Sequence, residues 1–261
     1  MSEDTAGQAT LLEAQGLSKS FAGLRAVVDM SIALRPGELV GLIGPNGAGK
    51  TTLFGLITGS VRPDAGTIRL GAADLTHLGP EKRLRVGLGR TFQIPRPFGE
   101  MTVLENVLTA VQNQTGESML ANIFAFRKVA EEERRSVDKA RSILDFLSLS
   151  DLENEPARIL SGGQRKLLEL ARVMITDPKV ILLDEPAAGV NPALLDLIID
   201  RIAEINAAGM TILLIEHNME MIQRLCGRVV VMAQGRRLAE GTPADIARDE
   251  EVAGAYLGEP A

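Results

Sequence analysis

The chain has 261 residues, of which 45% are hydrophobic, so it is long and apolar enough for one large α/β domain or a core with a smaller subdomain, and bulk disorder is excluded. Its 34 acidic residues outnumber its 28 basic ones, which gives a net charge of −6 and argues against a nucleic-acid partner, because such binders usually carry a basic excess. The one cysteine, Cys226, excludes an internal disulfide, fits a reducing compartment and is expected to be a small buried hydrophobe.

No membrane-spanning segment is evident in the sequence. No run approaches the roughly 18–20 apolar residues that cross a bilayer, and the first stretch, MSEDTAGQAT, is too polar and acidic for a signal peptide. We therefore expect a soluble chain that reaches a membrane only through a partner.

Residues 11–43 are predicted to form strands, with a turn at Pro36–Glu38. A helix is expected after Gly49, because TTLFGLITG has apolar residues at helical spacing and ends near Gly59. The segment GTIRL, which follows a turn, is predicted to be a short strand.

The pattern changes between residues 94 and 155. A Pro-broken loop in IPRPFGEMTVLENVLTAVQ leads into an amphipathic helix, and KVAEEERRSVDKARSILDFLSLS is a charged helix with an apolar stripe. Strand-like runs are absent there. We expect a helical subdomain, 94–155, inserted into an α/β core made of residues 1–93 and 156–261.

The α/β pattern then resumes. Strands are predicted at KVILLDE, MTILLIE and RVVVMA, and the tail ADIARDEEVAGAYLG is expected to form two short helices. Between them, NPALLDLIIDRIAEINAAG is a helix with Asn191 as its N-cap, Pro192 in the first turn and Gly209 at its end. Alternating strands and helices predict a mainly parallel sheet.

The strongest chemical signal is a phosphate-binding loop, GPNGAGKT, which matches the pattern G-x-x-x-x-G-K-[ST] and lies between an apolar strand and a helix. Its glycines let backbone N–H groups surround phosphate oxygens, and the helix start adds a positive dipole end. Lys50 is expected to meet the outer phosphates and the Thr51 hydroxyl to ligate magnesium. The nucleotide-binding residues expected here are Gly44, Pro45, Asn46, Gly47, Ala48, Gly49, Lys50, Thr51 and Thr52.

Two adjacent acids end the buried strand of VILLDE. In parallel sheets ligands bind beyond the carboxyl ends of the strands. Because successive strand side chains diverge, we expect Asp184 to hold magnesium and Glu185 to act as general base on the attacking water.

A second glycine-rich helix start, LSGGQ, precedes RKLLELARVMI. Ser161 and Gln164 have capping-box spacing, which is a structural role in its own right. Glycines at positions 162 and 163 are costly for a helix, so we expect a ligand to approach the backbone there. A hydroxyl, bare backbone and a helix N-terminus make Ser161, Gly162, Gly163 and Gln164 a second anion site.

A phosphate loop, LSGGQ and ILLDEP, in this order, resemble the nucleotide-binding subunit of an ATP-binding-cassette transporter, over nearly the whole chain. The resemblance implies a P-loop NTPase core with a mainly parallel sheet, an N-terminal antiparallel β subdomain and an inserted α-helical subdomain. It implies an ATPase that uses ATP and Mg²⁺. In that family two cassettes pair head to tail, so that the phosphate loop of one and LSGGQ of the other enclose each ATP.

Further roles follow from the resemblance alone. Gln93 matches the glutamine that bridges magnesium and the membrane partner, and His217 matches the histidine that contacts the γ-phosphate; the alternatives are an ordinary polar residue and a structural histidine. Phe21 matches the aromatic residue that stacks on adenine, with a core phenylalanine as the rival. The family usually has an aspartate where Asn191 stands, so a role that needs charge there is in doubt.

Several segments narrow the resemblance. RTFQIPRPFGEMTVLENV, DEPAAGVNP and VAGAYLG resemble cassettes that energise uptake of branched-chain and other hydrophobic amino acids; relatives serve urea, amides or lipopolysaccharide export. This implies permease subunits, a second cassette that is a copy or a different chain, an indirect periplasmic solute-binding protein, and a peripheral place on the cytoplasmic face of the inner membrane. A basic stretch is expected either to receive a permease helix or to be a solvated face: Lys82, Arg83, Arg85, Arg90 and Arg96, with Phe92 and Phe98.

Other function classes fit less well. Non-transport cassette proteins of DNA repair or translation usually carry two cassettes or long coiled-coil insertions, and this chain has neither. A P-loop kinase or GTPase would leave LSGGQ without a purpose, and the guanine motif N-K-x-D is missing from the sequence.

Overall fold

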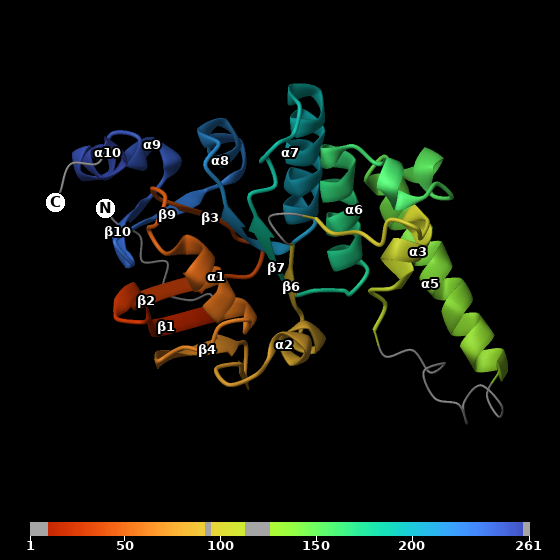
Figure 1. The fold of residues 1–261 in the computed structure, drawn as a ribbon, viewed down its shortest axis with the longest axis horizontal. Coiled ribbons are helices and arrows are strands. Elements are labelled where there is room, and N and C mark those ends of the chain that lie inside the picture. The colour runs from red at the N-terminus through yellow and green to blue at the C-terminus, as the bar shows by residue number, and fades with distance from the viewer. Residues whose placement is uncertain (1–9, 92–94, 113–125, 258–261) are drawn as a thin grey trace. The chain divides into compact units, whose positions relative to one another are not determined.

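The computed structural model describes residues 10–91, 95–112 and 126–257 (Figure 1). The chain divides into two compact units. The first contains residues 1–90, 179–187 and 202–261, and the second contains residues 91–178 and 188–201.

The strands described lie in the first unit and form two sheets. One is antiparallel, in the order β2-β1-β4-β5, and the other has the order β10-β9-β3-β8-β7-β6, in which only β10 runs antiparallel to its neighbour. The antiparallel sheet comprises β1 (Leu12–Phe21), β2 (Leu24–Leu34), β4 (Ala65–Leu70) and β5 (Ala73–Asp74). The other comprises β3 (Leu39–Ile43), β6 (Leu88–Arg90), β7 (Val180–Asp184), β8 (Thr211–Ile215), β9 (Arg228–Ala233) and β10 (Arg236–Gly241).

The central strands β3, β7 and β8 are buried along their whole length, as expected for apolar strands of a parallel sheet. The helix α1 (Lys50–Thr58) packs against β1 and β2, and its apolar side chains share one core cluster with both sheets. Its cap Gly59 is left-handed (φ 81°), which only glycine adopts without strain. The remaining helices that lie wholly in this unit are α2 (Pro80–Val86), α8 (Met219–Leu225), α9 (Pro243–Ile246) and α10 (Glu250–Leu257).

Helices build the second unit: α3 (Val103–Leu108), α5 (Phe126–Phe146), the 3-10 turns η2 (Ser150–Leu152) and η3 (Ala157–Ile159), and α6 (Gly162–Met174). The helix α6 packs on α3 and α5, and Figure 1 shows these three helices beside one another. The helix α7 (Pro192–Ala207) contributes residues 192–201 to this unit. Among the described residues no helix is long and apolar enough to cross a membrane.

The expected fold class is confirmed: an α/β core with a mainly parallel sheet, an N-terminal antiparallel sheet and an inserted helical part. The expected helical subdomain, 94–155, differs in extent from the second unit, which also takes in residues 91–93, 156–178 and 188–201. The physical reason is the packing of α6 on α3 and α5, which places the helix after LSGGQ with the helical part. The elements α2, β6, α8 and β10 were not predicted from the sequence.

Candidate functional site

The phosphate loop connects the buried strand β3 to α1, as the sequence predicts. Two of its glycines are required by close contacts. A Cβ on Gly44 would lie 2.0 Å from the carbonyl oxygen of Met232, and a Cβ on Gly49 would lie 2.3 Å from that of Ala26. Both also have positive φ, 147° and 99°, so any other residue would strain the loop and displace a neighbour.

Lys50, the first residue of α1, is buried and folds back over this loop. Its Nζ donates hydrogen bonds to the carbonyl oxygens of Gly44 (2.6 Å) and Pro45 (3.0 Å). Burial lowers the pKa of the Lys50 ammonium, and the nearby carboxylate of Glu185 opposes that shift. The Lys50 ammonium is thus held against a loop whose backbone N–H groups and helix N-terminus favour an anion.

The acid pair ends β7, and its two side chains have different partners. Asp184 is 3% exposed, and its Oδ2 accepts a hydrogen bond from Arg90 Nη2 at 2.9 Å. Arg90 also donates to the Thr58 hydroxyl at 3.2 Å. Arg90 was expected to belong to a permease groove or to a solvated face, whereas in the structure it is the counter-ion of Asp184.

Glu185 turns the other way, toward His217. The His217 Nε2 lies 3.1 Å from Glu185 Oε1. Glu185 has φ 48°, a left-handed conformation that is strained for a residue with a side chain. The structure therefore brings Lys50, Asp184, Glu185 and His217 together in the first unit, and their catalytic roles stay predictions.

The LSGGQ segment begins α6, in the second unit. The capping box is confirmed: the Ser161 N–H donates to Gln164 Oε1 (2.9 Å), and the Gln164 N–H donates to Ser161 Oγ (3.3 Å). Ser161 and Gly162 are exposed. A Cβ on Gly163, however, would lie 2.1 Å from Leu194 Cδ2, so packing on α7 explains this glycine without a ligand.

Of the remaining residues expected at the site, the structure describes Phe21 and Asn191 but not Gln93. Phe21 ends β1 with 46% of its surface exposed, so it is not a core residue, and the Lys19 ammonium lies 5.5 Å from the ring centre. Gln93 and Phe92 lie outside the described residues. Asn191 caps α7, since its Oδ1 accepts the Leu194 N–H at 2.9 Å.

The expectation that Arg83 belongs to a basic surface is wrong. Arg83 is 1% exposed and donates to the carbonyl oxygens of Leu56 (2.6 Å) and Ile57 (2.5 Å), which end α1, and to those of Thr76 and Leu78. It closes the C-terminus of the helix whose N-terminus carries the phosphate loop. Arg85, Arg96 and Phe98 are exposed and remain surface residues.

The donor set suits magnesium that is shared with a phosphate. Among the described residues, no group of three or more His, Cys, Asp and Glu side chains could hold a metal ion by itself. Mg²⁺ usually takes one or two protein oxygens and completes its shell with phosphate oxygens and water. The Asp184 carboxylate and the exposed Thr51 hydroxyl fit that requirement.

One buried acid near this site was not predicted from the sequence. Glu216 directly follows β8, is 2% exposed, and accepts three backbone hydrogen bonds from the residues around Glu185 and His217. The signal in the sequence is an acid immediately after the apolar run TILLI.

Comparisons with known proteins agree with this geometry. Residues 27–188 match the family described as ABC transporter, and residues 236–261 match the family described as branched-chain amino acid ATP-binding cassette transporter. A high-affinity branched-chain amino acid transport ATP-binding protein of Salmonella typhimurium is 43% identical over 253 residues, which cover 95% of this chain and 98% of that protein. A probable protein of the same kind from Archaeoglobus fulgidus is 40% identical over 248 residues, 95% of each chain.

Solved structures show the same fold. A nucleotide-free ATP-binding cassette from an ABC transporter has a TM-score of 0.83 and 38% identity, covering 96% of this chain and all (100%) of that one. The ADP conformation of an ATP-binding cassette of an ABC transporter has a TM-score of 0.82 with the same identity, 38%, and the same coverage, 96% and 100%.

Proposed function

Because this chain belongs to the ABC transporter family, and is therefore an ATP-binding-cassette ATPase, we propose that it energises uptake of branched-chain or related hydrophobic amino acids through a separate permease. The observation that carries the solute class is the match of residues 236–261 to the branched-chain cassette model. This tail is a separate segment from the nucleotide-binding motifs that all cassettes share, so it adds information that the phosphate loop does not.

In the proposed cycle, the loop residues 44–52 bind the phosphates of ATP. Lys50 exchanges its loop carbonyl partners, Gly44 and Pro45, for phosphate oxygens. The exposed face of Phe21 stacks on the adenine. Backbone N–H groups and the start of α1 then stabilise the negative charge.

Asp184, Thr51 and Gln93 are the residues proposed to hold Mg²⁺, which neutralises charge on the phosphates when bound. Glu185 accepts the proton of the attacking water, and His217, which lies 3.1 Å from it, orients that carboxylate and contacts the γ-phosphate. The Arg90 contact keeps Asp184 compensated in the nucleotide-free chain.

We propose that Ser161, Gly162 and Gln164 serve the ATP of a neighbouring cassette. The exposure of Ser161 and Gly162 at the start of α6 supports this, because their hydroxyl and N–H groups can meet a phosphate from outside the chain. Gly163 has a packing role instead. The chain then works only as a pair of cassettes, attached to permease subunits at the cytoplasmic face of the inner membrane, with a periplasmic binding protein supplying the solute.

Solute uptake tests this function. Cells that lack the gene and carry the wild-type chain with its permease should accumulate labelled leucine, and cells with Lys50→Ala should not. Uptake of urea or amides in place of leucine would overturn the solute class. Equal leucine uptake with and without the wild-type chain would overturn the transport role.

A further inference from the structure

The carboxyl group of Glu216 links the segment that contains Glu185 to the segment that contains His217. Its Oε1 accepts the N–H of Ala187 at 2.6 Å, two residues after Glu185. Its Oε2 accepts the N–H groups of His217 (2.9 Å) and Asn218 (3.1 Å). One side chain thus links the loop after β7 to the segment between β8 and α8.

This link begins where the parallel ladder ends. The last register pair of β7 and β8 is Asp184 with Ile215. The ladder is extended by one bond, from the Glu185 N–H to the Ile215 carbonyl oxygen at 3.0 Å. Beyond it the backbones diverge, and the Glu216 side chain supplies the next acceptor. Sheet pairing therefore does not fix the loop after Glu185; Glu216 does.

The loop needs such a restraint because Glu185 is strained. Its φ of 48° is a conformation that a residue with a side chain keeps only when its surroundings hold it there. Two hydrogen bonds provide that restraint, one from the Glu185 N–H itself and one from the Ala187 N–H two residues later.

We propose that Glu216 is a positioning residue, which holds the Glu185 base and His217 in register for hydrolysis. A simple role in capping α8 does not account for the contacts. Asn218 already caps that helix, since its Oδ1 accepts the Met221 N–H, and the bond to Ala187 does nothing for α8. The proposal rests on the proposed ATPase mechanism and adds a residue that acts through the backbone around Glu185 and His217.

Two substitutions separate the local bonds from the bond between the segments. Glu216→Asp shortens the side chain by about 1.5 Å. It keeps the short-range bonds to His217 and Asn218, which acidic side chains make readily to following N–H groups, but loses Ala187. Glu216→Gln places an amide NH₂ against backbone N–H donors on one side, so it breaks one set of bonds. The control is Glu220→Gln, the same change on the exposed surface of α8.

In the cassette assembled with its permease, both Glu216 variants should lower kcat at least about tenfold with little change in KM for ATP. The chain has two histidines, His77 and His217, so NMR of the imidazoles gives a direct readout. The Glu216 variants should shift the His217 signals and leave those of the exposed His77 in place; Glu220→Gln should move neither.

A Glu216→Asp variant that folds, keeps wild-type kcat and shows an unmoved His217 signal would overturn the proposal. A fall in kcat that is matched by an equally large rise in KM, with shifts at both histidines, would also overturn it, since that result indicates general destabilisation. Failure of the proposed function would appear in a different variant: Lys50→Ala would then keep ATP turnover. That result does not depend on the outcome for the Glu216 variants.

Discussion

Arg90 Nη2 lies 2.9 Å from Asp184 Oδ2, so the carboxylate that is proposed to bind magnesium is already paired with an arginine of the same chain. Removing that cation leaves a carboxylate that is 3% exposed without this compensation. We expect Arg90→Met to destabilise the nucleotide-free chain by about 2–3 kcal/mol, and MgADP to restore part of the loss by providing a cation at the site.

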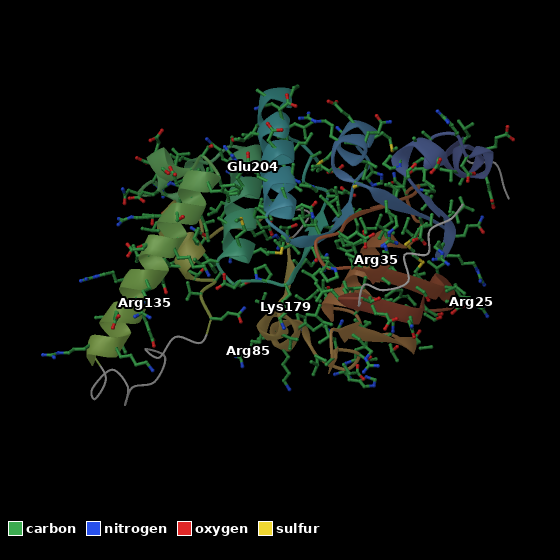
Figure 2. All side chains as sticks on the ribbon, turned by 180° about the vertical axis from the view of Figure 1, so that it is seen from behind. Arg25, Arg35, Arg85, Arg135, Lys179 and Glu204 are labelled. Carbon is green, nitrogen blue, oxygen red and sulfur yellow. The ribbon has the colours of Figure 1, made fainter. Side chains whose placement is uncertain are left out.

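Thermal unfolding with and without MgADP measures this effect. The control is Arg85→Met, which removes an arginine from an exposed pair with Glu81 on α2 and should change stability by less than about 1 kcal/mol. Arg85 is labelled in Figure 2, and its guanidinium pairs with Glu81 one turn earlier on the same helix. Equal shifts for the two variants would show that Arg90 does not compensate Asp184.

Arg83 gives a second stability prediction. Its guanidinium satisfies four backbone carbonyl oxygens, two of them at the end of α1. Arg83→Met removes these four hydrogen bonds from the backbone carbonyls and should cost about 3 kcal/mol in the free energy of unfolding. Urea unfolding of this variant beside Lys82→Met, an exposed neighbour, is the measurement, and similar midpoints for the two would contradict the role assigned to Arg83.

Phe21 should control nucleotide affinity. Phe21→Ala removes the stacking face and should weaken ATP binding roughly threefold to tenfold without unfolding the chain, because the side chain is half exposed. The sequence has no tryptophan, so Phe21→Trp supplies a single tryptophan, and ATP should change its emission. Unaltered tryptophan emission at saturating ATP would contradict the stacking of residue Phe21 on the adenine.

Cys226 makes stability depend on pH. Burial raises the pKa of its thiol from 9.0 to about 12, with a smaller contribution from the charge of Glu216. Between these values the unfolded chain has lost the proton that the folded chain retains, so stability falls as pH rises above 9. The thiol should also resist alkylation at pH 8 until the chain unfolds.

Urea midpoints of the wild type and Cys226→Ala, compared at pH 8 and pH 10.5, isolate this contribution. Other groups titrate in both proteins, so the difference between them is the relevant quantity. The wild type should lose more stability than the variant over this interval. An equal loss of stability in the wild type and in Cys226→Ala would show that Cys226 is not the cause.

Local patterns in the sequence were enough to predict the phosphate loop, the acid pair and the two capped helices, since each depends on residues a few positions apart. Asn191 and Ser161 cap their helices as predicted. The errors concern long-range contacts. Arg83 and Arg90 look like surface cations because nothing nearby in sequence shows that α1 ends beside one and β7 beside the other.

Gly163 illustrates the same limit. Two costly glycines suggested a ligand, but Leu194 of α7, 31 positions along the chain, occupies the space at one of them. Glu216 was missed because Ala187, the partner that links it to the loop after Glu185, becomes its neighbour only when β7 and β8 pair. Sequence patterns thus identify chemical groups, whereas the partners that tune them depend on the tertiary fold.

The most direct test of the central claim is ATP binding and phosphate release by Glu185→Gln in the assembled transporter. The amide keeps the size of the side chain but cannot accept the proton of water. We expect ATP affinity close to that of the wild type, hydrolysis reduced at least about a hundredfold, and trapped ATP in a closed pair of cassettes. Phosphate release at the wild-type rate would contradict the assignment of Glu185 as the base, and with it the mechanism proposed for this site.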